Sequence, residues 1–206
     1  SIFSEDVMLT KPRKETRSIP NYSEALTLLS ILRVPWNVIR HSIMVASFTK
    51  RIVESLKNDN AIDENLVFAG ALLHDVGRIK SHGADHGVIG RKILLNLGFP
   101  DSLARMCETH TIFSVEDEET SNMLGIPIGN YLPTTLEEKI VAYADKRIHR
   151  GKILSSVEER YNYWFKRFGQ QKVLIKGLKI CKEIEKELAA LAGQRKGFFV
   201  GKGRWA

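Results

Sequence analysis

The feature that most constrains this chain is an apolar run that ends in two adjacent polar residues. Residues 66–73 read Leu-Val-Phe-Ala-Gly-Ala-Leu-Leu, and His74 and Asp75 follow directly. A segment that is apolar on every side predicts a buried helix. Histidine and aspartate are seldom fully buried without a partner, because burying an unpaired polar group or charge is costly. The sequence therefore predicts two side chains at the end of a buried helix that need a strong partner, and a metal ion is one.

The residues after this pair extend the prediction. Gly77 suits the end of a helix, where a left-handed residue is common, and Arg78 is a candidate ligand for an anion. Neighbouring helical residues point about 100° apart. His74 and Asp75 therefore cannot chelate one ion as an i, i+4 pair does, but they suit two neighbouring ions with Asp75 bridging them.

Four other residues of the metal-ligand type fall on apolar helix faces or at predicted helix ends. His41 lies in the apolar stripe of one predicted helix, and Asp145 lies in the stripe of a helix that begins at a capping box at Thr135. His86 falls in the first turn of a predicted helix, and His110 on the inner side of the next. A single histidine on such a face is more often an ordinary core residue, so the prediction depends on the whole set.

Together these side chains have the chemistry of a metal centre. Imidazole and carboxylate groups suit Fe²⁺, Mn²⁺, Co²⁺, Ni²⁺ or Zn²⁺, with Mg²⁺ as a further option. They exceed the four ligands of a tetrahedral zinc site. We therefore expect one or two divalent ions per chain, and a pair about 3.5–4 Å apart would generate a hydroxide nucleophile at neutral pH. The expected ligands are His41, His74, Asp75, His86, His110 and Asp145.

The order His41, His74-Asp75 and Asp145 resembles the HD-domain superfamily of metal-dependent phosphohydrolases. Val76 and Gly77, which follow, extend the resemblance to the His-Asp-x-Gly subgroup. Residues 82–86 and 135–145 resemble a little-characterised archaeal and bacterial branch of these hydrolases. The resemblance covers most of residues 21–150. It implies an all-α HD-domain helical bundle, here with extra C-terminal helices, and hydrolysis of a phosphomonoester, a phosphodiester or a nucleotide.

Two comparisons within the superfamily refine this expectation. His86 and His110 make the chain similar to its binuclear members, including HD-GYP cyclic-dinucleotide phosphodiesterases and diadenosine tetraphosphate hydrolases. However, Arg78 stands where the HD-GYP enzymes typically have lysine, and their Gly-Tyr-Pro signature is absent. The sequence therefore argues against cleavage of cyclic dinucleotides.

The resemblance also suggests roles for residues near the predicted ligands. Asp75 and Arg78 are the expected catalytic residues, with Arg78 steadying the phosphoryl group. The substrate would be a phosphorylated small molecule or a nucleotide, with nucleic acid as a further option. Basic residues beside helix ends are also common without any function, and we interpret His149 as a surface residue. The candidates for binding the substrate are Arg78, Lys80, His82, Lys146 and Arg147.

Two other functions stay open at this point. The same ligand order resembles the HD-type di-iron oxygenases, whose ligand cage is shared. The second is non-enzymatic binding of nucleic acid or nucleotides. Residues 151–206 carry 13 Lys and Arg against 5 Asp and Glu, whereas residues 1–150 carry 18 against 19. This basic quarter could attract phosphates, but it could equally be the solvated face of ordinary helices, which is the interpretation we favour.

Length and composition suggest one well-packed domain, since the chain has 206 residues of which 43% are hydrophobic. Residues 113–133 combine an acidic run with glycines and prolines, which predicts a long surface loop, either a lid or a plain connection. The C-terminal helix and aromatic tail are the expected surface for a homodimer. The predicted parts are an N-terminal arm (1–20), a metal-binding domain (21–150) and a basic C-terminal helical extension packed on that domain (151–206).

The sequence also bears on the cellular location. It contains no run of 18 apolar residues and no signal-peptide pattern at its start. Cys107 and Cys181 lie in apolar helical patterns, outside any Cys-x-x-Cys pair. We therefore expect a cytoplasmic protein with buried, reduced thiols and no contact with membranes.

Overall fold

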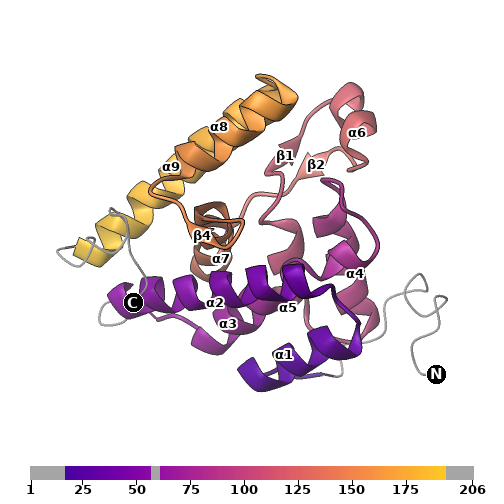
Figure 1. The fold of residues 1–206 in the computed structure, drawn as a ribbon, viewed down its shortest axis with the longest axis vertical. Helices are drawn as coiled ribbons and strands as arrows, with labels where there is room; N and C mark the ends of the chain where they lie inside the picture. Colours follow the sequence, from indigo (N-terminus) through magenta and orange to yellow (C-terminus); the bar gives the residue numbers. More distant parts are fainter. Residues whose placement is uncertain (1–16, 57–60, 194–206) are drawn as a thin grey trace.

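A computed structural model describes residues 17–56 and 61–193 of the chain (Figure 1). Most of these residues are helical. The strands among them are two residues long and form two antiparallel pairs. The predicted all-α class is therefore confirmed. Within the same residues, no helix is long and apolar enough to cross a membrane.

The helices and strands follow one another in a simple order. They are α1 (Tyr22–Ile31), α2 (Trp36–Leu56), α3 (Glu64–Leu73), the 3₁₀ helix η2 (Val76–Ile79), α4 (His86–Asn96), α5 (Asp101–Glu108), β1 (Ser114–Val115), α6 (Glu118–Leu124), β2 (Gly129–Asn130), α7 (Leu136–Arg147), β3 (Ile148–His149), β4 (Lys152–Ile153), α8 (Val157–Phe168) and α9 (Lys172–Ala192).

The predicted buried helix, α3, is the central element of the bundle. It packs against α1, α2, α5 and α7, and nearly all its side chains from Leu66 onward are buried. Its N-terminus is fixed by Asp63, whose carboxylate accepts a hydrogen bond from the Leu66 amide at 3.0 Å. Since its C-terminal end runs directly into His74 and Asp75, these residues start from the middle of the core.

Helix α7 carries the last predicted ligand, and an ion pair with a buried carboxylate fixes its first turn. The Thr135 hydroxyl accepts a hydrogen bond from the Glu138 amide, as the predicted capping box requires. The Glu138 carboxylate instead binds the Arg105 guanidinium of α5, with Nε to Oε1 at 2.8 Å, and the Thr134 amide. The pair therefore ties α5 to α7.

Helices α8 and α9 form the C-terminal part of the described chain. They lie along one edge of the molecule, drawn from orange to yellow in Figure 1, and α9 packs on α7 and α2. Leu174, Cys181 and Leu188 form an apolar stripe along α9 and are buried. The tail with its aromatic residues and residues 1–16 of the expected N-terminal arm lie outside the described residues.

Two local predictions are corrected by the structure. Residues 113–133 are not a plain surface loop, because β1, α6 and β2 form within them and Phe113 and Ile126 are buried. Gly77 does not end a helix in a left-handed conformation, since it lies inside η2 and its φ is not positive. The glycine is required by close packing instead: a Cβ there would lie 1.9 Å from the carbonyl oxygen of His86.

Candidate metal centre

The structure brings all the predicted ligands together at one place in the bundle. Each comes from a different element or its end: α2, the end of α3, the start of η2, the start of α4, the segment after α5, and α7. Apart from His41, which is half-buried, these side chains are buried. In that order they are His41, His74, Asp75, His86, His110 and Asp145.

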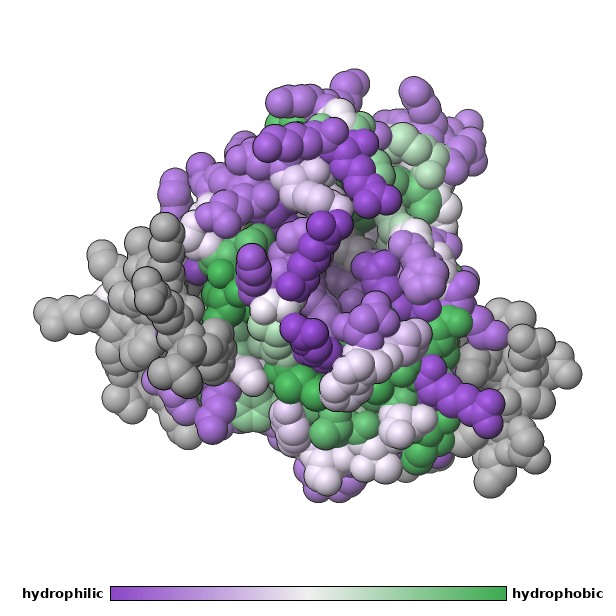
Figure 2. All heavy atoms as spheres, viewed as in Figure 1, coloured by the Kyte–Doolittle hydropathy of each residue, from purple (hydrophilic) through white to green (hydrophobic). Residues whose placement is uncertain are grey.

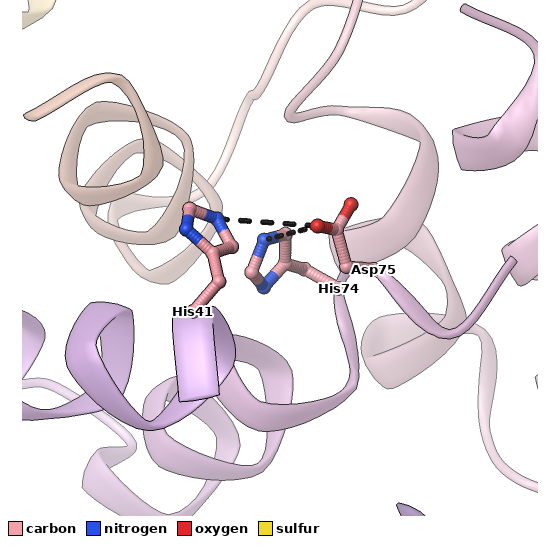
Figure 3. A group of neighbouring side chains, drawn as sticks. All are labelled: His41, His74 and Asp75. Atoms are coloured by element: carbon pink, nitrogen blue, oxygen red, sulfur yellow. Dashed lines mark ion pairs between the residues drawn. The ribbon is translucent and has the colours of Figure 1, made fainter. Parts of the chain in front are cut away.

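The carboxylate of Asp75 lies between two pairs of imidazole nitrogens. Its Oδ1 is 3.0 Å from Nε2 of His86 and 3.4 Å from Nε2 of His110. Its Oδ2 is 3.7 Å from Nε2 of His74 and 3.9 Å from Nε2 of His41. Figure 3 shows the rings of His41 and His74 directed at this second oxygen. One carboxylate thus presents a different oxygen to each of two groups that could hold a metal ion.

The carboxylate of Asp145 completes the group around His41 and His74. Its Oδ1 is 2.8 Å from Nε2 of His41 and 3.5 Å from Nε2 of His74. Its other oxygen accepts a hydrogen bond from the buried ammonium of Lys146 at 2.9 Å. The same ammonium donates to the backbone carbonyl of His110. Lys146 therefore helps to position Asp145, beside His41 and His74, and His110, beside His86.

Hydrogen bonds to the protein backbone fix which histidine nitrogens face the centre. Nδ1 of His74 lies 2.7 Å from the Ala71 carbonyl oxygen, and Nδ1 of His86 lies 2.7 Å from the Gly83 carbonyl oxygen. Since a carbonyl oxygen can only accept, each Nδ1 carries a proton, which leaves Nε2 as the ring nitrogen that could bind a metal ion. This is the arrangement that orients metal-binding histidines in proteins.

An unpaired buried nitrogen supports the presence of a further partner. Among the described residues, Nε2 of His74 is buried and makes no hydrogen bond, although such groups are costly to leave unpaired. Across the centre, Nε2 of His86 and Nε2 of His110 face each other at 3.2 Å. Cations between these nitrogens and carboxylates would satisfy both features, so the residues present fit one or two divalent metal ions.

The electrostatics of the centre favour ionised carboxylates. Burial acts to raise the pKa of Asp75, but the neighbouring His74, His110 and His86 outweigh it and hold the pKa well below its usual range. The pKa of Asp145 is likewise well below its usual range, because Lys146 and the histidines around it outweigh burial. Two buried negative charges therefore lie within one cluster, which suits a cation.

The histidines differ in their titration. Burial lowers the pKa of His110 to about 3, so this imidazole is neutral and able to bind a metal near pH 7. Burial also acts to lower the pKa of His74, but Asp75 and Asp145 outweigh it and raise the pKa. Asp75 and Asp145 thus favour a second proton on the His74 imidazole. A metal ion would take the place of this proton, because metal ions and protons compete for imidazole nitrogens.

Comparison with known proteins assigns the family. The family model described as HD domain matches residues 38–148, which include all six residues of the centre. The chain belongs to the HD-domain family. It is also 39% identical over 146 residues to an uncharacterised protein of Methanocaldococcus jannaschii, a match that covers 68% of this chain and 85% of that protein.

Two longer relatives carry a different name. The chain is 32% identical over 181 residues to a tRNA (cytidine(56)-2'-O)-methyltransferase of Picrophilus torridus, and 38% identical over 150 residues to one of Thermoplasma volcanium. The matches cover 88% and 73% of this chain but only 50% and 43% of those proteins. The chain thus spans half or less of each methyltransferase. No solved structure matches the chain significantly.

A cavity of about 760 Å³ opens onto the centre of this HD domain, within the size range of small-molecule sites. Figure 2 shows a hollow near the middle of the face in view, surrounded largely by hydrophilic residues. The predicted substrate ligands Arg78 and His82 line the cavity, and so do Phe113 and Met123 of the segment predicted as a loop or lid. That segment therefore contributes part of the wall.

Three other predicted substrate ligands lie in less favourable positions. Lys80 is exposed but is not among the residues that line the cavity. Lys146 lines it, but the ammonium is held by Asp145 and His110. Arg147 is fully buried outside the cavity lining, and its Nε donates to the Leu154 carbonyl at 2.9 Å. The expected contact of Arg147 with substrate is therefore wrong, because this side chain packs α7 against the segment that follows it.

The sequence interpretation also missed residues that line the cavity. His149, taken as a surface residue, is half-buried there. Arg150, Arg160, Trp164 and Arg167 line the cavity from the C-terminal part of the chain. The available signal was the spacing of Arg160, Trp164 and Arg167, which places them on one face of a helix.

Proposed function

We propose that this HD domain is a metal-dependent phosphohydrolase that cleaves a phosphomonoester or phosphodiester bond with water. The observation that supports this most is the position of the Asp75 carboxylate, with one oxygen toward each pair of histidine nitrogens. Two-metal phosphohydrolases need a shared ligand of this kind, since both ions act on the same phosphoryl group. The cavity beside the centre provides room for a substrate.

The chain would hold the metal ions through the six ligand residues. Divalent ions held there supply an activated water and neutralise the charge that develops on the phosphoryl oxygens. Lys146 holds Asp145 in place through its hydrogen bond to Oδ2. The backbone carbonyls of Ala71 and Gly83 keep His74 and His86 in the tautomer that binds a cation.

Arg78 is the residue best placed to steady the phosphoryl group. Its Nε donates to Oδ1 of Asp75 at 3.3 Å, and its Nη1 donates to the carbonyl oxygen of His82 at 3.1 Å. A guanidinium has five N–H donors, so further donors remain for a phosphoryl oxygen in the cavity. Because both contacts fix the side chain before substrate binds, little reorganisation is needed during the reaction.

The proposal is tested with metal-stripped protein reloaded with Mn²⁺, Fe²⁺, Co²⁺, Ni²⁺, Zn²⁺ or Mg²⁺. Phosphate release is measured from mononucleotides and sugar phosphates, and cleavage of dinucleotides and phosphorylated oligonucleotides by chromatography. We expect metal-dependent hydrolysis of at least one substrate. Loss of a direct ligand in Asp75→Ala should reduce the rate at least about a hundredfold, since even supporting residues contribute 10–100-fold.

Two further measurements make this experiment decisive. Glu54→Gln removes an exposed carboxylate from α2 and should leave hydrolysis unchanged. Undiminished hydrolysis by Asp75→Ala would overturn the mechanism. Substrate-dependent oxygen consumption by the iron-loaded protein, without any hydrolysis, would overturn the reaction class in favour of an HD-type oxygenase.

The longer relatives favour RNA as a second candidate partner. Both are named for acting on tRNA, and the C-terminal part of this chain is basic. Binding of tRNA without hydrolysis would be the alternative function, and it should weaken steeply as salt concentration rises. Filter binding at several salt concentrations tests it, and binding that is absent or insensitive to salt would remove it.

A further inference from the structure

Three arginines outside the metal centre line the same cavity. Arg150 follows β3, and Arg160 and Arg167 belong to α8. Seven residues are about two helical turns, so the two arginines of α8 lie on one face of this helix. All three lie in the basic quarter of the chain, whose sequence alone is typical of a solvated surface.

The positive charge of these arginines is not neutralised by neighbouring carboxylates. The carboxylates among the lining residues are Asp75 and Asp145, and both belong to the metal centre. Within the described residues, none of the three arginines makes an ion pair with a carboxylate, and one nitrogen of Arg160, Nε, is buried without a hydrogen bond. Arginine stays charged at every physiological pH. This side of the cavity therefore attracts anions.

Aromatic rings hold each guanidinium in place. The guanidinium carbon of Arg160 lies 4.8 Å from the ring centroid of Trp164, and that of Arg167 lies 5.3 Å from the ring of Phe168. The guanidinium carbon of Arg150 lies 5.3 Å from the ring of Tyr163. Such cation–π contacts keep the side chains ordered.

This aromatic group is close to the metal centre. The Trp164 ring, which lines the cavity, lies 5.8 Å from the ammonium of Lys146. That ammonium donates to Asp145 at 2.9 Å. A single side chain therefore separates the indole from a metal-ligand carboxylate, so one extended ligand can reach both.

The pKa of a neighbouring histidine is in line with this positive charge. The pKa of His149 is lowered to about 4 by burial, and then by the positive charges of Arg160 and Arg150. Nearby positive charge disfavours a protonated imidazole. Arg160 and Arg150 therefore both lie close enough to His149 to disfavour its protonated form.

We propose that Arg150, Arg160 and Arg167, with Trp164 and Phe168, form a second subsite that binds a nucleotide through its base and through a phosphate other than the one cleaved. Aromatic faces and guanidinium planes are the groups that stack on unpaired bases, and guanidinium groups bind phosphates in a bidentate manner. The proposal rests on the proposed function, because it names the substrate class of the same cavity. The ligand chemistry is an unpaired nucleotide with more than one phosphate, either free or at the end of an RNA strand.

Calorimetric titration of the metal-free protein tests the subsite without any hydrolysis. The probes are adenosine 5′-monophosphate, adenosine 3′,5′-bisphosphate and a 5′-phosphorylated oligoadenylate. We expect the bisphosphate to bind more tightly than the monophosphate. Arg167→Gln should weaken the bisphosphate about tenfold, the size of a lost hydrogen bond to a charged group, with a smaller effect on the monophosphate. Trp164→Ala should weaken both adenosine ligands about tenfold, because it removes base stacking.

The chain offers a matched control beside Arg167. Lys166→Gln removes the same charge from the adjacent position of α8, where the side chain is exposed and does not line the cavity. We expect its affinities to stay within about twofold of the wild type. Equal effects of the Lys166 and Arg167 variants would overturn the subsite, because they would show a general effect of net charge. Circular dichroism checks that each variant is folded.

The probes also separate the two sources of the ligand and the two proposals. Tighter binding of the oligoadenylate than of the bisphosphate, lost in Arg167→Gln, supports an RNA end; equal or weaker binding supports a free nucleotide. Arginine-dependent binding without hydrolysis of any substrate would leave the subsite standing and overturn the proposed function. If the protein hydrolyses a substrate and its KM is the same in Arg160→Gln, Arg167→Gln and Lys166→Gln, the proposed function stands and the subsite is overturned.

Discussion

Replacing Gly77 with alanine tests whether close packing of η2 on α4 holds the candidate metal ligands together. A Cβ at this position would lie 1.9 Å from the carbonyl oxygen of His86 and 2.7 Å from the amide nitrogen of Gly90. Carbon–oxygen contacts normally begin at about 3.3 Å, so the first contact is too short by more than 1 Å. Both neighbours are backbone atoms that cannot rotate away. Helix α4 must therefore move relative to η2.

This movement has an expected cost in stability and in metal binding. Overpacking of this kind costs about 1–3 kcal/mol, and we expect Gly77→Ala to lower the free energy of unfolding by about 3 kcal/mol, since backbone has to shift. His86 starts α4 and lies 3.0 Å from Asp75, whereas metal sites tolerate deviations of about 0.2 Å. The group of Asp75, His86 and His110 should therefore lose its ion first.

Urea unfolding and the metal content of the purified protein measure both effects. The matched control is Gly129→Ala in β2, where a Cβ would lie 3.4 Å from Tyr131, an ordinary contact. We expect this control to change stability by less than about 1 kcal/mol and to leave the metal content unchanged. A Gly77→Ala protein as stable as the wild type, with the same metal content, would refute the packing argument.

Three further predictions concern residues away from the substrate. Glu138→Gln should lower the free energy of unfolding by about 2 kcal/mol at pH 7, because Arg105 outweighs burial and lowers the pKa of this carboxyl from its usual value. In urea unfolding, the wild type should lose this advantage as the pH falls below the usual pKa and through the lower pKa of the folded state. Arg147→Met should cost about 3 kcal/mol in thermal or urea unfolding, but leave the KM of hydrolysis unchanged. The buried thiols should react with a thiol reagent only on unfolding, because burial raises the pKa values of Cys107 and Cys181.

The sign of the pH effect follows from linkage. A carboxyl whose pKa is lower in the folded state stabilises the protein above its unfolded pKa, and this contribution disappears as both states become protonated. Glu54→Gln, at an exposed position, should show no such dependence. Parallel pH curves for the wild type and Glu138→Gln, a raised KM in Arg147→Met, or thiol labelling of the native protein would each contradict the corresponding prediction.

The helices and the set of candidate ligands could be predicted from the sequence because both leave local patterns. Apolar residues at helical spacing mark a buried face, and a histidine or aspartate on that face stands out against it. His41 and Asp145 are identified in this way, and the structure places both beside His74. The buried residues of α9 follow the same spacing.

The incorrect predictions concern contacts between elements, which local patterns do not encode. Position 77 requires glycine because the backbone of α4 lies close to it. The residues next to Gly77 in the sequence give no indication of this contact. Arg147 was expected to bind substrate because it follows Asp145 and carries charge. However, α7 is covered on several sides, so the position two residues after a ligand points into the packed interior, where the Arg147 Nη1 donates to the Tyr143 hydroxyl at 2.6 Å.

The basic C-terminal quarter shows the limit of charge patterns. Solvated helix faces and phosphate-binding faces have the same residue types, and only the position of α8 beside the cavity separates them. The combination of arginine and tryptophan on one face of α8, at Arg160, Trp164 and Arg167, is a more specific signal for the proposed nucleotide subsite. Basic residues on a solvated helix face need no aromatic neighbour, whereas a subsite that stacks a base needs one.

The two parts of the cavity also differ in how they relate to the family. The candidate metal ligands lie within residues 38–148, which the HD-domain model matches, whereas Arg150, Arg160, Trp164 and Arg167 lie beyond it. On the two proposals, the chemistry would come from the part that the HD-domain model matches and the selectivity from the helices that follow it, since function resides in sites added to a shared fold. On this argument, changes at Trp164 or Arg167 should alter which phosphate compound is bound but leave the metal content of the centre unchanged. A loss of metal from Arg167→Gln would show that the two parts are not separable.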